Sequence, residues 1–146
     1  AFDQSGSSVS SAGDINGDGL DDLIIGAPFA SRSSGESYVV FGSKDRFSAR
    51  LHVSNLNGTN GFAINGINQD DDSDRSVSNA GDVNGDGIDD LIISAPSANT
   101  NGSDSGQCYV VFGSRGGFGA NFDLSTLNGT NGFAINGINP GDRLRR

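Results

Sequence analysis

Short apolar runs separated by turn-forming residues predict a chain built from β-strands. The Leu-Ile-Ile runs at residues 23–25 and 91–93 are continuous, as in a strand buried on both faces. Other segments concentrate Tyr, Val, Phe and Ile, and no segment shows ten or more residues of helical periodicity. The predicted strands cover residues 7–12, 23–27, 37–41 and 62–67, and then 75–80, 91–95, 108–112 and 133–138.

The chain contains two copies of one unit. Residues 9–28 and 77–96 agree at 16 of 20 positions with an offset of 68 residues. Three extra residues lie between Pro96 and Gly106, in a polar stretch typical of a surface loop. The other repeated segments are 35–43 with 106–114, and 57–68 with 128–139, both at an offset of 71 residues.

The repeat predicts the fold class. We assign one unit to residues 1–68 and the other to residues 69–139, while the tail 140–146 opens a third copy in the same phase as residues 1–7. Four short antiparallel strands per unit are typical of a β-propeller blade. The prediction is an all-β chain of two four-stranded antiparallel propeller blades. Because closure takes about 4–8 blades, these would be part of a larger propeller or assembly.

Composition narrows the functional classes. The chain has 1 Cys and 1 His, which excludes an internal disulfide and argues against zinc binding and His- or Cys-based catalysis. The chain has 18 Asp and Glu against 9 Lys and Arg, for a formal net charge of −9. An acidic chain without a stripe of basic residues is a poor nucleic-acid binder. The apolar runs are far shorter than the roughly 20 residues of a membrane-spanning helix.

The connection between the first two strands of each unit carries the strongest chemistry. Both copies read D-x-N-x-D-G-x-x-D. Oxygens at positions 1, 3 and 5 can converge, Gly at position 6 allows a sharp turn, and a carbonyl at position 7 and a carboxylate at position 9 add ligands for Ca²⁺. The predicted ligands are Asp14, Asn16, Asp18, the Leu20 carbonyl and Asp22 in the first loop, and Asp82, Asn84, Asp86, the Ile88 carbonyl and Asp90 in the second.

Two alternatives to calcium stay open for these loops. One is an Asp-, Asn- and Gly-rich hairpin without a metal, and the other is Mg²⁺ or Mn²⁺. Two loops with three carboxylates each would suffer repulsion without a cation, which favours about two Ca²⁺, one per blade. An EF-hand is excluded because its position 12 needs Glu, whereas Ile25 and Ile93 occur here. Asp21 and Asp89, at position 8, are expected to face solvent or to support the ligands from outside.

Residues 14–28 and 82–96, each followed by Tyr-Val-Val-Phe-Gly, resemble the FG-GAP repeats of the integrin α-subunit β-propeller, especially the bacterial extracellular versions. The resemblance implies a propeller with Ca²⁺ in the hairpin between the first two strands of a blade, held by the ten residues named above. It departs from the family where Ser5-Gly6 replaces the Phe-Gly of the first strand. The family closes seven blades and this chain has two, and no partner transfers because ligand specificity sits in variable loops.

These observations favour a calcium-binding, extracellular or cell-surface, integrin-α-like propeller module for adhesion or protein interaction. The alternative is a self-assembling structural subunit of an extracellular fibre or surface layer, in which copies join head to tail into a ring or fibre. An enzyme is disfavoured because Glu36, the only Glu, is replaced by Gln107 in the second copy. Expected partners are other copies of the chain, further blades of a longer chain, or an extracellular protein or glycan.

Two short motifs leave their interpretation open. Three N-x-S/T sequons would be glycosylated only in a secretory pathway that performs the reaction, and such triplets also arise by chance in an Asn- and Thr-rich chain. The basic end at residues 143–146 is either a processing site or a solvated tail. The sequons begin at Asn57, Asn101 and Asn128.

Three further side-chain types receive structural predictions. Cys108 is expected to be a small, half-buried strand residue, and His52 is expected at the surface because the second copy has no matching His. The Phe residues that recur with the repeat are predicted to form the core of each blade. They are Phe41, Phe62, Phe112 and Phe133.

Overall fold

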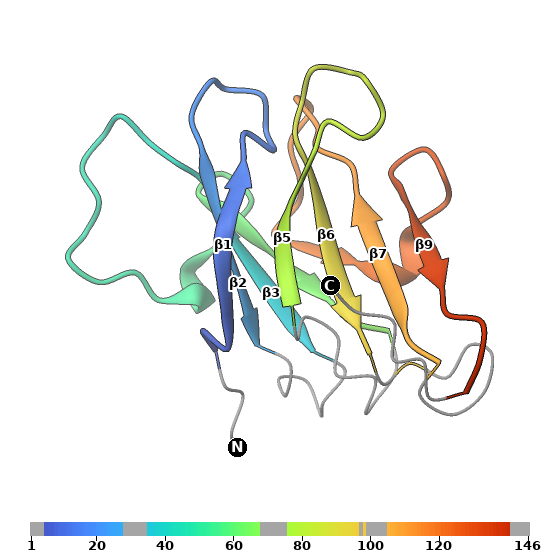
Figure 1. Cartoon of the computed structure of the whole chain (residues 1–146). Coiled ribbons are helices and arrows are strands. Elements are labelled where there is room, and N and C mark those ends of the chain that lie inside the picture. Colours follow the sequence, from blue (N-terminus) through green and yellow to red (C-terminus); the bar gives the residue numbers. More distant parts are fainter. Residues whose placement is uncertain (1–4, 28–34, 68–75, 97, 99–104, 141–146) are drawn as a thin grey trace.

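Two β-sheets make up the fold, which we describe from a computed structural model. One sheet has the strand order β1-β2-β3-β4-β8 and the other β5-β6-β7-β9. They pack together with β1 and β5 side by side (Figure 1). The structure describes residues 5–27, 35–67, 76–96, 98 and 105–140. The strands are β1 (Ser8–Gly13), β2 (Asp22–Ala27), β3 (Glu36–Val40), β4 (Gly61–Asn65), β5 (Ser76–Gly81), β6 (Asp90–Ala95), β7 (Gln107–Val111), β8 (Asn121–Asp123) and β9 (Gly132–Asn136).

The all-β prediction is confirmed, and each of the eight predicted strands begins within one residue of its predicted start. In both sheets the Leu-Ile-Ile run lies in the second strand and pairs with the strand before it and the strand after it. Apolar β-branched residues favour this central position because their side chains pack well on a pleated surface. Two 3₁₀ helices, η1 (Val53–Asn55) and η2 (Leu124–Thr126), are the only helices in the described part of the chain.

Strand β8 was not predicted, and it joins the two halves of the chain. It comes from the second repeat but pairs in parallel with β4 of the first sheet, with Ala63 opposite Asn121 and Ile64 opposite Phe122. The N–H of Ala63 also donates to the carbonyl of Ala120 at 2.9 Å. The Asn-Phe-Asp sequence of β8 is too short to show an alternating pattern, so its pairing could not be predicted from apolar periodicity.

The core lies between the two sheets. Burying a large apolar side chain contributes about 1.5–3 kcal/mol. Phe62 is fully buried in this core and Phe41 nearly so, as predicted, whereas Phe133 is 36% exposed and the prediction for it is wrong. Phe133 lies on the side of the second sheet that faces away from the first. Fully buried core residues are Ile15, Ile24, Val39, Phe62 and Ile64 from the first repeat, and Val77, Leu91, Ile93, Tyr109 and Val111 from the second.

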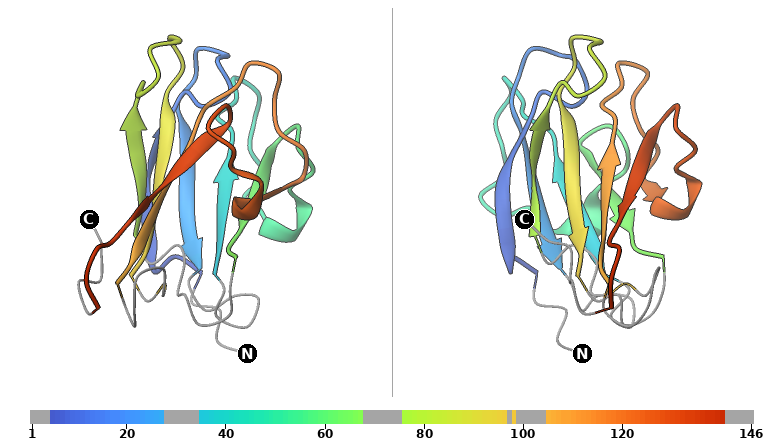
Figure 2. Two further views of the ribbon diagram at one scale, coloured as in Figure 1. Left: turned by 90° about the vertical axis from the view of Figure 1, so that its right-hand side faces the viewer. Right: turned by 45° about the vertical axis from the view of Figure 1, so that its right-hand side comes forward.

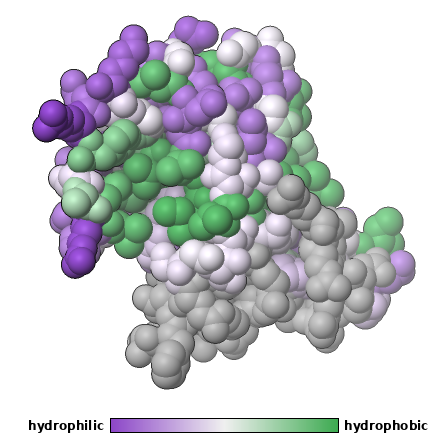
Figure 3. Space-filling view, turned by 60° about the vertical axis from the view of Figure 1, so that its left-hand side comes forward, coloured by the Kyte–Doolittle hydropathy of each residue, from purple (hydrophilic) through white to green (hydrophobic). Residues whose placement is uncertain are grey.

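The outer face of the first sheet is open to solvent, which corrects one prediction. Strand β2 was expected to be buried on both faces, but Leu23 is 56% exposed and its neighbour Val9 on β1 is 67% exposed. Described residues leave the part of this face around Val9 and Leu23 uncovered, and the surface there shows a band of apolar side chains (Figure 3). Cys108 is buried, more than the half-burial predicted, and burial raises the pKa of its thiol. His52 is exposed, as predicted.

Some predictions fall on residues outside the described part. These are the tail from residue 141 with its basic end, the sequon at Asn101, most of the insertion after Pro96, and Arg75 at the start of the predicted strand. The sequons at Asn57 and Asn128 are on the surface, and their glycosylation stays a prediction, as do the repeat boundaries. No helix in the described residues has the length and apolar character needed to cross a membrane.

Candidate metal centre

Both acidic loops lie at the same end of the molecule. The first joins β1 to β2 and the second joins β5 to β6, and the two project side by side beyond the sheets (Figures 1 and 2). This placement follows from the repeat, because the same hairpin occupies the same position in each blade. Any cation bound in the two loops would therefore lie at one end of the two-blade unit.

The first loop coils around the carboxylate of Asp14. The N–H of Asp18 donates to Oδ1 of Asp14 at 3.0 Å, and the N–H of Gly19 donates to Oδ2 at 2.8 Å. Oδ1 of Asp18 in turn accepts the N–H of Leu20 at 2.9 Å. Gly17 and Gly19 have φ values of 74° and 87°, in the left-handed region that favours glycine. The side chains at positions 1, 3 and 5 thus lie in one tight turn, while their role as calcium ligands stays a prediction.

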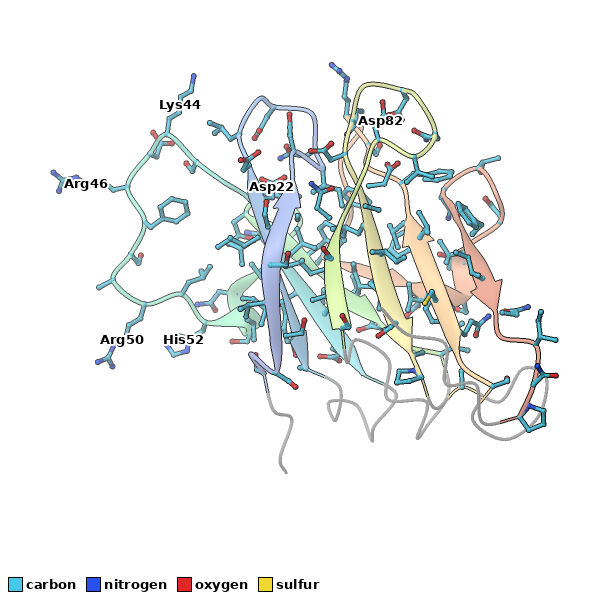
Figure 4. All side chains as sticks on the ribbon, in the orientation of Figure 1. Asp22, Lys44, Arg46, Arg50, His52 and Asp82 are labelled. Carbon is cyan, nitrogen blue, oxygen red and sulfur yellow. The ribbon has the colours of Figure 1, made fainter. Side chains whose placement is uncertain are left out.

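The second loop repeats this arrangement around Asp82 (labelled in Figure 4). Its carboxylate accepts the N–H of Gly85 at 2.8 Å, of Asp86 at 3.0 Å and of Gly87 at 2.8 Å. These hydrogen bonds, above all that from Gly87, lower the pKa of Asp82 because they stabilise its charged form. Asp82 is therefore ionised at neutral pH, which is the form that binds a cation.

Asp22, at position 9, is a fully buried carboxylate at the base of the first loop (Figure 4). Its Oδ2 accepts the N–H of Ile15 at 3.0 Å, and its Oδ1 accepts the N–H of Gly42 at 2.8 Å. Burial is the main cause of its raised pKa. The two N–H groups oppose this shift, and the negative charges of Asp18 and Asp14 add to it. The carboxylate of Asp22 is thus close enough to Asp18 and Asp14 to be repelled by both.

Asp90 has the same role in the second loop and is also fully buried. Its two oxygens accept the N–H of Val83 at 2.7 Å and of Gly113 at 2.8 Å. Each position-9 carboxylate therefore ties the start of its loop to the end of the third strand of the same blade. This structural role adds to the ligand role that the motif predicts.

The donor set fits calcium in its chemistry. All the predicted donors are oxygens, and three of the five in each loop are carboxylates. Carboxylates alone do not make the site, because no group of three or more Asp, Glu, His or Cys side chains in the described residues is gathered to hold a metal ion. A cation in the first loop would therefore also need the amide oxygen of Asn16 and the carbonyl of Leu20.

Comparison with known proteins identifies the family. The FG-GAP repeat profile matches residues 5–40 and 75–111, which include both acidic loops and the first three strands of each sheet. The chain belongs to the FG-GAP repeat family. Its two sheets are FG-GAP propeller blades, which confirms the resemblance seen in the sequence.

Integrin α chains are similar to this FG-GAP protein. Integrin alpha-PS5 of Drosophila melanogaster is 39% identical over 98 residues, which are 64% of this chain and 9% of the relative. Integrin alpha-4 of Xenopus laevis is 31% identical over 113 residues, 76% of this chain and 10% of the relative. Integrin alpha pat-2 of Caenorhabditis elegans is 35% identical over 126 residues, which are 77% of this chain and 9% of the relative. The chain thus spans about a tenth of the length of these relatives.

Asp89 has a role at the contact between the two FG-GAP blades that the sequence did not show. Its Oδ2 accepts the N–H of Asp14 at 3.0 Å, and its own N–H donates to the carbonyl of Asp14 at 3.2 Å. The second blade therefore holds the first ligand position of the first blade's loop. Asp21, the counterpart of Asp89 in the first blade, is exposed. The motif showed an Asp at position 8 of both loops, but spacing along the chain cannot reveal a contact between blades.

Arg115 brings a positive charge to the acidic end of the FG-GAP blades. A Cβ atom on Gly17 of the first loop would lie 2.6 Å from Cγ of Arg115, and one on Gly87 of the second loop would lie 4.0 Å from a guanidinium nitrogen. The side chain therefore runs between the two loops. Four other basic side chains lie along the connection from β3 to β4 and point into solvent (Figure 4). They are Lys44, Arg46, Arg50 and His52.

Proposed function

We propose that this FG-GAP chain is a calcium-binding, extracellular propeller module that acts in adhesion or protein interaction and has no catalytic activity. One observation carries the calcium assignment. The same oxygen-rich loop, coiled around its first Asp, occurs at the same end of both blades. The similarity to integrin α chains supports the adhesion assignment, although the matched segments cover only 9% and 10% of those relatives.

Calcium would stabilise the loops chiefly by offsetting charge. Asp18 and Asp14 repel the carboxylate of Asp22, and burial of Asp22 strengthens the repulsion because the local dielectric is low. Each Ca²⁺ adds two positive charges, so two ions would change the formal net charge from −9 to −5. A bound ion would also restrict the hairpin that joins the first two strands of each blade.

Calcium titration by calorimetry tests this proposal. We expect two sites in the wild-type chain and one in each of the variants Asp14→Ala and Asp82→Ala, because each removes the central carboxylate of one loop. Thermal unfolding followed by circular dichroism should show a melting temperature that EDTA lowers and Ca²⁺ restores. A melting temperature unaffected by EDTA, or unchanged stoichiometry in both variants, would refute a structural calcium site.

The non-catalytic assignment is supported by the cleft beside the first loop. This cleft has a volume of about 610 Å³, and its described lining contains one carboxylate, Asp18, which is also a predicted calcium ligand. Glycosidases, for comparison, use a pair of carboxylates on the two sides of the bond that they cleave. A screen of extracellular proteins and glycans for binding to the calcium-loaded chain tests the interaction role. Turnover of a glycan in the same screen would contradict the assignment.

A structural subunit that assembles with copies of itself is the second candidate function. Exposed apolar side chains on the outer faces of both blades favour it. Electron microscopy of the purified protein in calcium separates the two candidates: filaments or a sheet-like array favour the structural subunit, whereas discrete particles favour the interaction module.

A further inference from the structure

The exposed apolar side chains of the first blade have buried counterparts in the second. Val9 is 67% exposed, whereas Val77, at the same position of the repeat, is 1% exposed. Leu23 is 56% exposed, whereas Leu91 is fully buried. Val77 and Leu91 are buried because they face the first blade. Their counterparts Val9 and Leu23 lie on the outer surface of the first blade. We call this surface the leading face and define it by Val9, Asp21, Leu23, Phe47 and residues 50–52.

The outer face of the second blade shows the converse relation. Val83 is 50% exposed, whereas its counterpart Ile15 is fully buried against the second blade. Phe133 is 36% exposed, whereas its counterpart Phe62 is fully buried. We call this surface the trailing face, defined by Val83, Phe133 and Ile135. The two outer faces thus carry the two halves of an interface that already exists once inside the chain.

The internal interface shows which contacts the outer faces would make. Phe118 of the second blade stacks on Phe62 of the first, with ring centroids 4.2 Å apart and planes at 12°. The counterpart of Phe118 is Phe47, which is 60% exposed on the leading face, and the counterpart of Phe62 is Phe133 on the trailing face. Phe47 of one copy therefore matches Phe133 of another.

A groove on the leading face matches the Val83 side of the trailing face. Within the chain, Ile15 packs against the second blade, where the N–H of Ser114 donates to its carbonyl at 2.9 Å. The counterpart of Ser114 is Ser43, which lines a groove of about 290 Å³ together with Leu23 and Phe47. This groove is open in the described structure, and the residue that corresponds to Ile15 is the exposed Val83.

Charge and backbone pairing are matched in the same register. Arg115 lies beside Gly17 of the first acidic loop, and its counterpart Lys44 is exposed and would lie beside the second acidic loop of another copy. Strand β8 pairs with β4, and its counterpart, residues 50–52, would pair with β9, where Phe133 and Ile135 are exposed. In one and the same arrangement of two copies, Lys44 would therefore lie beside an acidic loop and residues 50–52 would pair with the free edge of β9.

We propose that the leading face of this chain binds the trailing face of a second copy, head to tail, with the geometry of the contact between its own two blades. Phe47 of one copy would stack on Phe133 of the other, and Val83 of that other copy would enter the groove beside Leu23. Asp21 would accept the N–H of Asp82, as Asp89 accepts that of Asp14. Because the contact is heterologous, it leaves one free face at each end and can extend to further copies.

Complementation between two variants tests this proposal. Phe47→Asp disables the leading face and Ile135→Asp disables the trailing face, and both residues are exposed and outside the acidic loops. In sedimentation velocity with Ca²⁺, we expect the wild type to associate with increasing concentration and each variant alone to stay monomeric. An equimolar mixture should form dimers and nothing larger, because each variant supplies the face that the other lacks.

Ile138→Asp is the matched control. Ile138 is 78% exposed, but its counterpart Ile67 is 40% exposed and is not buried between the blades, so this variant should associate like the wild type. A wild-type chain that stays monomeric at every concentration tested overturns the proposal and leaves the two faces to other partners. A mixture of folded variants that stays monomeric, or a single variant that associates like the wild type, also overturns it. Far-UV circular dichroism establishes that each variant is folded, and Val9→Asp replaces Phe47→Asp if that variant is not.

Discussion

Replacing Asp90 with Ala should destabilise the protein even when calcium is absent. The buried carboxylate of Asp90 accepts two backbone N–H groups, from Gly113 in the interior and from Val83 at the partly buried start of the loop. A buried N–H left without an acceptor costs about 1–3 kcal/mol, and loss of the second bond adds about 0.5–1.5 kcal/mol. The expected loss is therefore about 1.5–4.5 kcal/mol, a large part of the roughly 5–15 kcal/mol that stabilises a typical domain.

Asp86→Ala is the matched comparison, because Asp86 belongs to the same loop but is exposed. Its Oδ1 accepts the N–H of Ile88 at 2.9 Å, and loss of such a bond costs about 1 kcal/mol. Both variants remove a predicted ligand of the second calcium site, so both should lose the part of the calcium-dependent stability that comes from the second loop. Only Asp90→Ala should retain the larger loss in EDTA.

Urea unfolding followed by far-UV circular dichroism, with EDTA and with Ca²⁺, measures both free energies. The slope of the free energy against urea concentration shows whether the same surface is exposed in each variant. Equal stability of Asp90→Ala and Asp86→Ala in EDTA would refute the structural role of Asp90. A large loss for Asp90→Ala in both conditions, with calcium stabilisation unchanged, would support the structural role and refute the ligand role.

Two further pairs of variants test the contact between the blades, each by urea unfolding in dilute solution. Phe118→Ala should cost about 2–3 kcal/mol through loss of a stacked, partly buried ring, whereas Phe47→Ala at the matching exposed position should cost less than about 0.5 kcal/mol; equal losses would contradict the stacking argument. Gly17→Ala and Gly85→Ala should each cost about 1–2 kcal/mol for a left-handed backbone. Gly17→Ala should cost more than Gly85→Ala, because the new methyl group would clash with Arg115 at Gly17 whereas nothing lies within 4 Å at Gly85. Equal costs would show that Arg115 moves aside freely.

The strand positions could be predicted from the sequence because they depend on local patterns. Apolar runs, turn residues between them and an internal repeat place each predicted strand start within one residue of the observed one. The coiled loops follow in the same way, because an Asp that accepts N–H groups four and five residues later needs only the local chain. Both kinds of feature are determined by neighbours along the sequence.

Features that depend on neighbours in space could not be predicted. Leu23 and Leu91 occur in the same Leu-Ile-Ile run, yet one is exposed and the other buried, because only the second faces another blade. Asp21 and Asp89 differ for the same reason, since only Asp89 reaches the backbone of a preceding loop. A near-identical sequence therefore has two environments, and the order of the repeats along the chain decides which copy has which.

The parallel pairing of β8 with β4 has a consequence for how further repeats can be added to such a chain. The fifth strand of the first sheet is supplied by residues 121–123, which belong to the second repeat. During synthesis, the first sheet is therefore completed only after most of the second repeat has left the ribosome. The repeat unit in the sequence is thus offset from the set of strands that makes up one sheet. Each added repeat closes the edge of the blade before it and exposes a new edge of its own.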